Sequence, residues 1–85
     1  EYTIQSGMIC TVGRSSSCNV QVNDKRVSRI HCTIERLPDG DYQMMERSSN
    51  GTYYNDVQLE RGKSYRIPRG ALLAIGDADN VLLLE

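Results

Sequence analysis

Apolar and polar residues alternate along most of the chain with a period of two, a pattern typical of half-buried β-strands. The alternation falls in short runs of β-forming residues, and turn-forming residues separate these runs at intervals of roughly ten residues. This rhythm predicts an all-β sandwich or barrel. The runs cover residues 8–12, 20–22, 30–35, 42–46, 64–67, 72–75 and 81–84.

The clearest predicted hairpin covers residues 30–46, where Pro38-Asp39-Gly40 separates two strands. Proline favours the opening of a turn, and Gly40 can adopt a positive φ. Asn50–Gly51, taken alone, is also a two-residue hairpin signal. Because the loops of a sandwich gather at its two ends, we expect a binding site to be built from loops rather than from a cleft in a sheet.

Length and charge exclude several classes of protein. The chain has 85 residues, enough for one domain over 1–85, and its net charge of −1 argues against a general nucleic-acid coat protein. No apolar run is long enough to insert in a membrane. The start without Met predicts a domain excised from a larger protein, and an odd number of cysteines, three, favours a reduced intracellular, cytoplasmic setting.

Positive charge is concentrated between Gly13 and His31, where Asp24 is the one acid. The ordinary interpretation of such loops is a solvated polar surface. The more specific interpretation is an anion site, in which arginine forks, serine hydroxyls and backbone N–H groups supply the donors. The basic residues are Arg14, Lys25, Arg26 and Arg29, interleaved with Ser15, Ser16, Ser17, Asn19, Asn23 and Ser28.

Two other groups of reactive side chains lack the spacing that their chemistry needs. Ser28 and His31 suggest a catalytic serine–histidine pair, but residues three apart on a strand point to opposite faces. We therefore interpret His31 as the anchor of its own loop. A zinc site could be imagined from Cys10, Cys18, His31 and Cys32, but their spacings contain no C-x₂-C or H-x₃-H element. We therefore predict buried or semi-buried thiols and no metal site.

Three short motifs, in this order and spacing, resemble the forkhead-associated (FHA) domain family: Gly13-Arg14, the segment 26–31 (RVSRIH) and the segment 48–55 (SSNGTYYN). The family pattern is a G-R pair, an S-R-x-H segment and, after a hairpin, an S-x-N-G-T segment. Glu46 and Asp56 differ from the residues that are commonest at these two positions of the family pattern. Neither position is one that the resemblance assigns to ligand binding. The resemblance extends over essentially the whole chain.

The resemblance implies an FHA-type β-sandwich of about eleven short strands, with the binding loops at one end. Members of the family bind phosphothreonine peptides and are not enzymes. At the matching positions, Arg14, Ser28 and Ser49 are the implied phosphate ligands, and Arg29 adds a contact or positive potential.

The remaining matched positions have other implied roles. Asn50 holds the peptide backbone beside the phosphothreonine. Arg26 is a candidate for selecting acidic peptide residues that follow the phosphothreonine on its C-terminal side. The implied structural supports are Gly13, His31, Gly51 and Thr52.

The sequence therefore predicts a phosphothreonine-dependent module that recruits phosphorylated partners in signalling or assembly. We expect no cofactor, no nucleic acid, no membrane insertion and a monomeric isolated domain. One alternative is a phosphate-independent scaffold of the same fold that uses a sheet face for assembly. A third, more distant alternative is a small hydrolase that uses Ser28 and His31.

Overall fold

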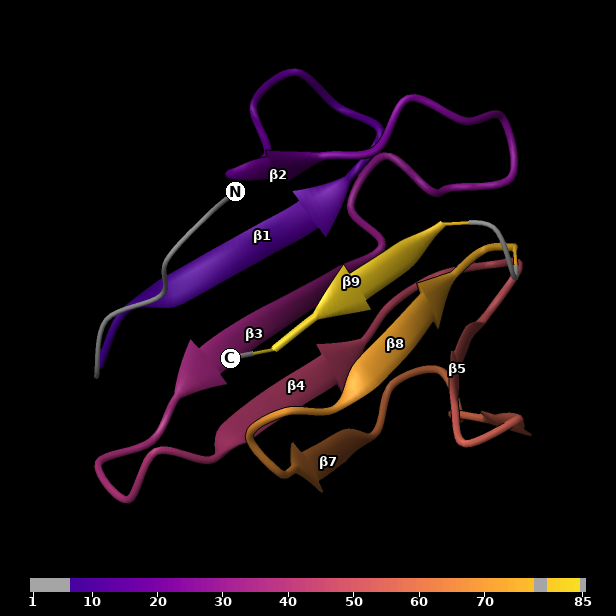
Figure 1. The fold of residues 1–85 in the computed structure, drawn as a ribbon. Helices are drawn as coiled ribbons and strands as arrows, with labels where there is room; N and C mark the ends of the chain where they lie inside the picture. The colour runs from indigo at the N-terminus through magenta and orange to yellow at the C-terminus, as the bar shows by residue number, and fades with distance from the viewer. Residues whose placement is uncertain (1–6, 78–79, 85) are drawn as a thin grey trace.

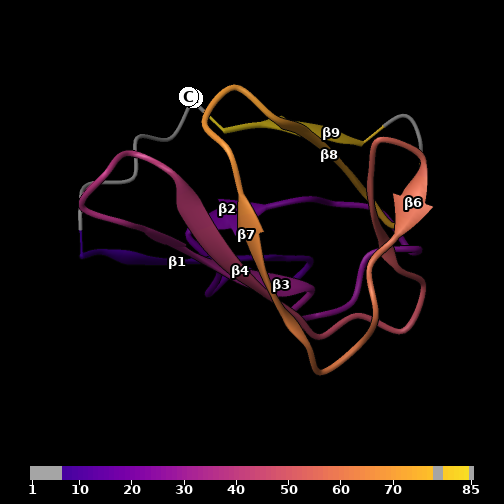
Figure 2. The ribbon, with the colours of Figure 1, turned by 90° about the horizontal axis from the view of Figure 1, so that it is seen from below.

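Two β-sheets pack face to face around the hydrophobic core, as the ribbon shows from two directions (Figure 1, Figure 2). The structure is a computed structural model that describes residues 7–77 and 80–84. One sheet has the order β2-β1-β3-β4-β7 and contains β1 (Ile9–Gly13), β2 (Val20–Gln21), β3 (Cys32–Arg36), β4 (Tyr42–Glu46) and β7 (Ser64–Ile67). The other has the order β6-β5-β8-β9 and contains β5 (Thr52–Tyr54), β6 (Val57–Gln58), β8 (Leu72–Ile75) and β9 (Val81–Leu83).

This architecture confirms the predicted all-β sandwich. The described residues form nine strands, fewer than the eleven or so that the resemblance implies. They contain no helix, and therefore none that is long and apolar enough to cross a membrane.

Alternation of inward and outward side chains builds the core. In β4, Tyr42, Met44 and Glu46 are buried, whereas Gln43 and Met45 face outward. Similar alternation in β1 and β8 turns apolar side chains inward, where the two sheets remove them from water. The core consists of Cys10, Val12, Val27, Cys32, Ile34, Tyr42, Met44, Leu59, Ile67, Ala71, Leu73, Ile75 and Leu84.

The hairpin predicted over residues 30–46 is confirmed. β3 and β4 pair in antiparallel register along their whole length, from Cys32 opposite Glu46 to Arg36 opposite Tyr42. Gly40 in the connecting turn has a φ of 95°, the left-handed conformation that glycine adopts without steric cost.

The hairpin interpretation of Asn50–Gly51 is wrong. These residues belong to the connection that leads from β4 in one sheet to β5 in the other, so they join no hairpin. The tight turn follows later, at Asn55–Asp56 between β5 and β6, where both residues have positive φ, 51° and 64°. Positive φ at both central residues is what a type I′ turn requires.

Four connections meet at one end of the sandwich. β1 ends, β3 begins and β4 ends at this end of the five-stranded sheet, which brings together the loops 14–19, 22–31 and 47–51 (Figure 1). The turn after β8 joins them, because the Gly76 N–H donates to the Gly51 carbonyl over 2.9 Å. The basic and hydroxyl-rich segments of the sequence therefore share one end of the fold.

Candidate functional site

Close backbone contact places Arg14 beside the loop that contains Ser28. The Arg14 N–H donates to the Ser28 carbonyl over 2.9 Å, and the Ser15 N–H donates to the Arg29 carbonyl over 3.2 Å. The contact depends on Gly13, because a Cβ atom built there would lie 2.2 Å from the Arg29 carbonyl oxygen. Glycine is the one residue that permits this approach without a backbone shift.

The Arg14 side chain is exposed but fixed at its stem. Its Nε donates to the Val27 carbonyl over 3.0 Å, whereas its two terminal nitrogens have no partner among the described residues. The guanidinium thus presents N–H donors to solvent from a defined position. A planar fork of this kind is suited to the oxygens of a phosphate or carboxylate.

Ser28 and Ser49 meet although 21 residues separate them. The Ser49 N–H donates to Ser28 Oγ over 3.0 Å, which leaves the hydroxyl hydrogen of Ser28 free to donate. Ser49 is exposed, and its own hydroxyl has no partner within the described part of the chain. Two residues with hydroxyl groups therefore lie next to each other at the end of the sandwich that also presents Arg14.

The buried His31 side chain connects the loops that carry Ser28 and Ser49. Its ring is fully buried, and Nδ1 accepts a hydrogen bond of 3.1 Å from the Ser28 N–H. The ring proton must then lie on Nε2, which donates to the Gly51 carbonyl over 2.8 Å. The imidazole thus links the two loops that carry Ser28 and Ser49.

The same contacts oppose a catalytic role for the pair. Both nitrogens of His31 are bound to backbone groups, so neither is available to take a proton from the Ser28 hydroxyl.

Asn50 contacts the loop on the other side of the site. Its Nδ2 donates to the Arg26 carbonyl over 2.9 Å, and the side chain is exposed. One amide hydrogen and the Oδ1 atom remain without a partner among the described residues, so they can bind an extended peptide backbone through one N–H and one C=O.

Arg26 lies between two carboxylates. It pairs with Asp24 over 2.7 Å and also with Asp77, which connects the loop before β3 to the turn after β8. Hydrogen bonds from the Arg26 side chain and backbone, and from Asn80, hold the pKa of Asp24 well below its usual range. The predicted selection of acidic residues by Arg26 stays a prediction, and Arg26 has this structural task in addition.

Arg29 follows Ser28 and is exposed, and its guanidinium has no partner among the described residues. Its carbonyl accepts hydrogen bonds from the Ser15 N–H and from Cys18 Sγ, so the backbone is held while the charge faces solvent. Arg29 therefore adds positive potential close to Ser28.

Glu46 is a supporting residue that sequence reasoning noted only as a departure from the family pattern. Its side chain is 1% exposed, yet both carboxylate oxygens are fully engaged. Oε1 accepts from Thr52 Oγ1 at 2.9 Å and the Arg47 N–H at 3.2 Å, and Oε2 accepts from Ser48 Oγ at 2.9 Å and the Thr52 N–H at 2.8 Å. The strict alternation along β4 was the available signal, because it places Glu46 inward, where a carboxylate needs several donors.

The Glu46 network fixes the loop tip between Ser48 and Thr52, which carries Ser49, Asn50 and Gly51. Gly51 has a φ of 99°, and its N–H donates to Ser48 Oγ over 2.9 Å. Both ends of the tip are thus bound to one buried carboxylate. Such preorganisation reduces the ordering cost when a ligand binds.

The three cysteines are free and buried. Burial raises the pKa of Cys10 to about 11 and also raises the pKa of Cys32, so both thiols stay protonated and neutral. Within residues 7–77 and 80–84, no group of three or more His, Cys, Asp or Glu side chains is arranged to hold a metal ion.

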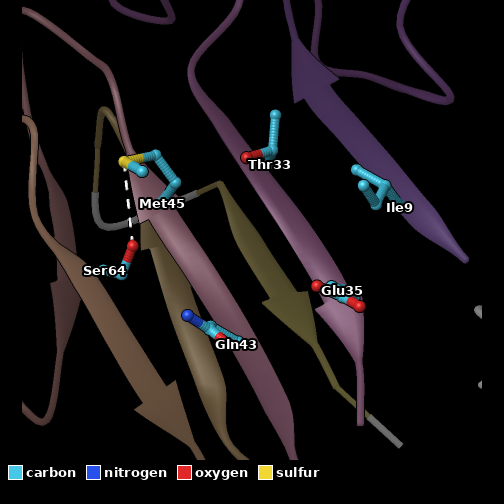
Figure 3. A pocket seen from close by; sticks show the side chains of 6 residues that line it. All are labelled: Ile9, Thr33, Glu35, Gln43, Met45 and Ser64. Atoms are coloured by element: carbon cyan, nitrogen blue, oxygen red, sulfur yellow. Dashed lines mark hydrogen bonds between the residues drawn. The ribbon is translucent and has the colours of Figure 1, made fainter. Parts of the chain in front are cut away.

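A separate hollow lies on the outer face of the five-stranded sheet (Figure 3). Its volume is about 190 Å³, and it is lined by Ile9, Thr33, Glu35, Gln43, Met45 and Ser64. The lining contains both polar and apolar side chains, with one carboxylate and no basic group. The hollow therefore has no positive charge to balance that of an anion.

Comparison with known proteins agrees with this geometry. The family model for the FHA domain matches residues 10–76. The chain is 34% identical over 74 residues to the probable serine/threonine-protein kinase fhkA of Dictyostelium discoideum, covering 78% of this chain and 12% of that protein. It is 31% identical over 78 residues to the E3 ubiquitin-protein ligase RNF8 of Homo sapiens, covering 86% of this chain and 16% of that protein. It therefore spans less than a fifth of either relative.

Among solved structures, the N-terminal FHA domain of S. cerevisiae Rad53p, in complex with a phosphothreonine peptide, has a TM-score of 0.72 at 24% identity. The match covers 91% of this chain and 68% of that chain, and it shows a common fold.

Proposed function

The chain belongs to the FHA domain family, and from that membership we propose that it is a phosphothreonine-dependent module that binds a phosphorylated protein partner. Arg14, Ser28 and Ser49 bind the phosphate, and Arg29 adds positive potential. Asn50 holds the peptide backbone beside the phosphothreonine. The Rad53p FHA domain, which has the same fold, was solved with a ligand of this class.

The observation that carries the proposal is the contact between Ser28 and Ser49 next to the guanidinium of Arg14. A phosphothreonine brings a charge of about −1.5 to −2 and three strong acceptor oxygens. One arginine fork and two hydroxyls can satisfy those oxygens, and each bond to a charged group contributes roughly 1.5–3 kcal/mol. Because an exposed site must also order a flexible peptide, we expect micromolar affinity.

Other expectations follow from the same proposal. The bound His31 ring supports a binding role without hydrolysis, and three free thiols suit a reduced, intracellular setting. We expect a monomer in isolation. The kinase and ligase activities of the relatives reside in proteins of which this chain covers only a small part, so neither activity is assigned to it.

We expect phosphothreonine to bind at least severalfold better than phosphoserine, and an acidic mimic to bind barely. Burial of the extra methyl group contributes about 0.8 kcal/mol, and the branched side chain loses less freedom on binding. A carboxylate has two oxygens in a plane and about half the charge, so it leaves one of the three phosphate donors unpaired. The test is a competition series of four otherwise identical peptides, containing phosphothreonine, phosphoserine, threonine or glutamate, against a labelled phosphothreonine peptide.

Equal competition by the phosphoserine or glutamate peptide would identify a generic basic surface. Equal competition by the unphosphorylated peptide would instead favour the phosphate-independent scaffold.

A further inference from the structure

The peptide bond between Asn50 and Gly51 combines a reactive sequence with a central place in the proposed site. The other four asparagines, Asn19, Asn23, Asn55 and Asn80, precede valine or aspartate, so Asn50 alone precedes glycine. A backbone nitrogen that follows asparagine can attack the side-chain amide carbon, and glycine hinders this attack least because it has no Cβ atom.

In the folded domain, both groups that would react are bound elsewhere. The Gly51 N–H, which would supply the nucleophile, donates to Ser48 Oγ over 2.9 Å, and Ser48 Oγ in turn donates to the buried Glu46 carboxylate over 2.9 Å. The Asn50 amide, which would be attacked, donates to the Arg26 carbonyl over 2.9 Å. Asn50 is nevertheless exposed to the water that the reaction consumes.

We propose that Asn50 is a latent deamidation site whose reaction is restrained by the hydrogen bond from Gly51 to Ser48 and whose conversion inactivates the domain. The Gly51 nitrogen loses its proton and forms a bond to Cγ of Asn50, while the bond from Cγ to Nδ2 breaks. Nδ2 leaves as ammonia and a cyclic imide remains. One water molecule then opens the ring and leaves either aspartate or isoaspartate.

The loss of binding rests on the proposed function, whereas the reaction itself does not. Conversion removes the Nδ2 donor that contacts the Arg26 carbonyl and is assigned to the peptide backbone. It also places a carboxylate next to Ser49, close to the bound phosphate, where two negative charges repel each other. Isoaspartate further lengthens the backbone of a loop tip that Glu46 holds at both ends.

The experiment follows deamidation of each asparagine by peptide mass spectrometry during incubation at mildly alkaline pH. Four samples are compared: the folded domain, the domain unfolded in urea, Ser48→Ala, and Ile67→Val as a control that weakens the core in β7 without touching the loop. We expect Asn50 to convert faster than the other asparagines in urea and slowly in the folded domain. Ser48→Ala should accelerate conversion about two- to tenfold, the factor for one lost hydrogen bond, whereas Ile67→Val should not.

Equal rates for Asn50 in the folded and unfolded chain would overturn the restraint, even if Ser48→Ala proved unable to fold. Equal rates for Ser48→Ala and Ile67→Val would overturn the role of Ser48. Phosphopeptide binding by the incubated domain should fall in step with Asn50 conversion, and undiminished binding at full conversion would overturn the inactivation. A fresh domain that binds no phosphopeptide would contradict the proposed function and leave the deamidation rates as an independent result.

Discussion

Replacing Arg14 with alanine is expected to weaken binding of a phosphothreonine peptide about tenfold to a hundredfold, with the fold retained. In the proposed site, the variant removes charge-assisted hydrogen bonds to the phosphate worth about 1.5–3 kcal/mol. It also removes the bond from Nε to the Val27 carbonyl, but the guanidinium is exposed, so little packing is lost. Calorimetric titration measures the affinity, and circular dichroism checks the fold.

Two variants separate the position of Arg14 from its charge. Arg14→Lys keeps the positive charge but loses the planar fork, so we expect intermediate affinity. Arg69→Ala also removes one positive charge, but this charge lies beside Gly40 in the turn at the opposite end of the sandwich. This variant should bind the phosphopeptide almost as well as the parent domain does. Similar affinities for Arg14→Ala and Arg69→Ala would remove Arg14 from the phosphate site.

Replacing Glu46 with alanine is expected to lower the free energy of unfolding by about 3–5 kcal/mol. The substitution leaves the Thr52 N–H and the hydroxyls of Ser48 and Thr52 in a buried region without their acceptor, whereas the Arg47 N–H keeps the His31 carbonyl. Measured losses of this size are uncommon and indicate a broken buried network. Denaturation in urea, with the slope compared between variants, gives the value.

Glu35 provides the matched control. It lies in the neighbouring strand β3 and is partly exposed on the outer face, and its carboxylate has no partner among the described residues. Glu35→Ala should therefore change the stability by no more than about 0.5 kcal/mol. If both glutamate variants have the same stability, the carboxylate of Glu46 is not what holds the loop tip.

The strands that alternate strongly were predictable from the sequence alone. β4 is one example, and its hairpin with β3 could be located from the residues of the connecting turn. Period-two patterning reports burial on one face, and these strands have one buried face each. β5 is only three residues long, too short to show this periodicity. The segment before it resembles a hairpin turn, but the residues that turn the chain are Asn55 and Asp56, after β5.

The site was predictable only through the order of its motifs. Nothing local in the sequence indicates that the Ser49 N–H contacts Ser28 Oγ, because that contact depends on how two loops from different connections pack. His31 was expected to anchor its own loop, and it also binds the loop of Gly51. Such long-range contacts depend on the topology of the fold, which the local preferences of single residues do not specify. In one sequence, the topology can be inferred from several family motifs that occur in the right order.

The most direct test of the central claim is a calorimetric titration of this domain with one threonine peptide in phosphorylated and unphosphorylated forms. In the proposed site, three charged or hydroxyl donors converge on the phosphate, so its removal should weaken binding by at least about a hundredfold. The proposed phosphate site predicts micromolar binding of the phosphorylated peptide and no measurable heat for the unphosphorylated one. Equal affinity for the two peptides would contradict it.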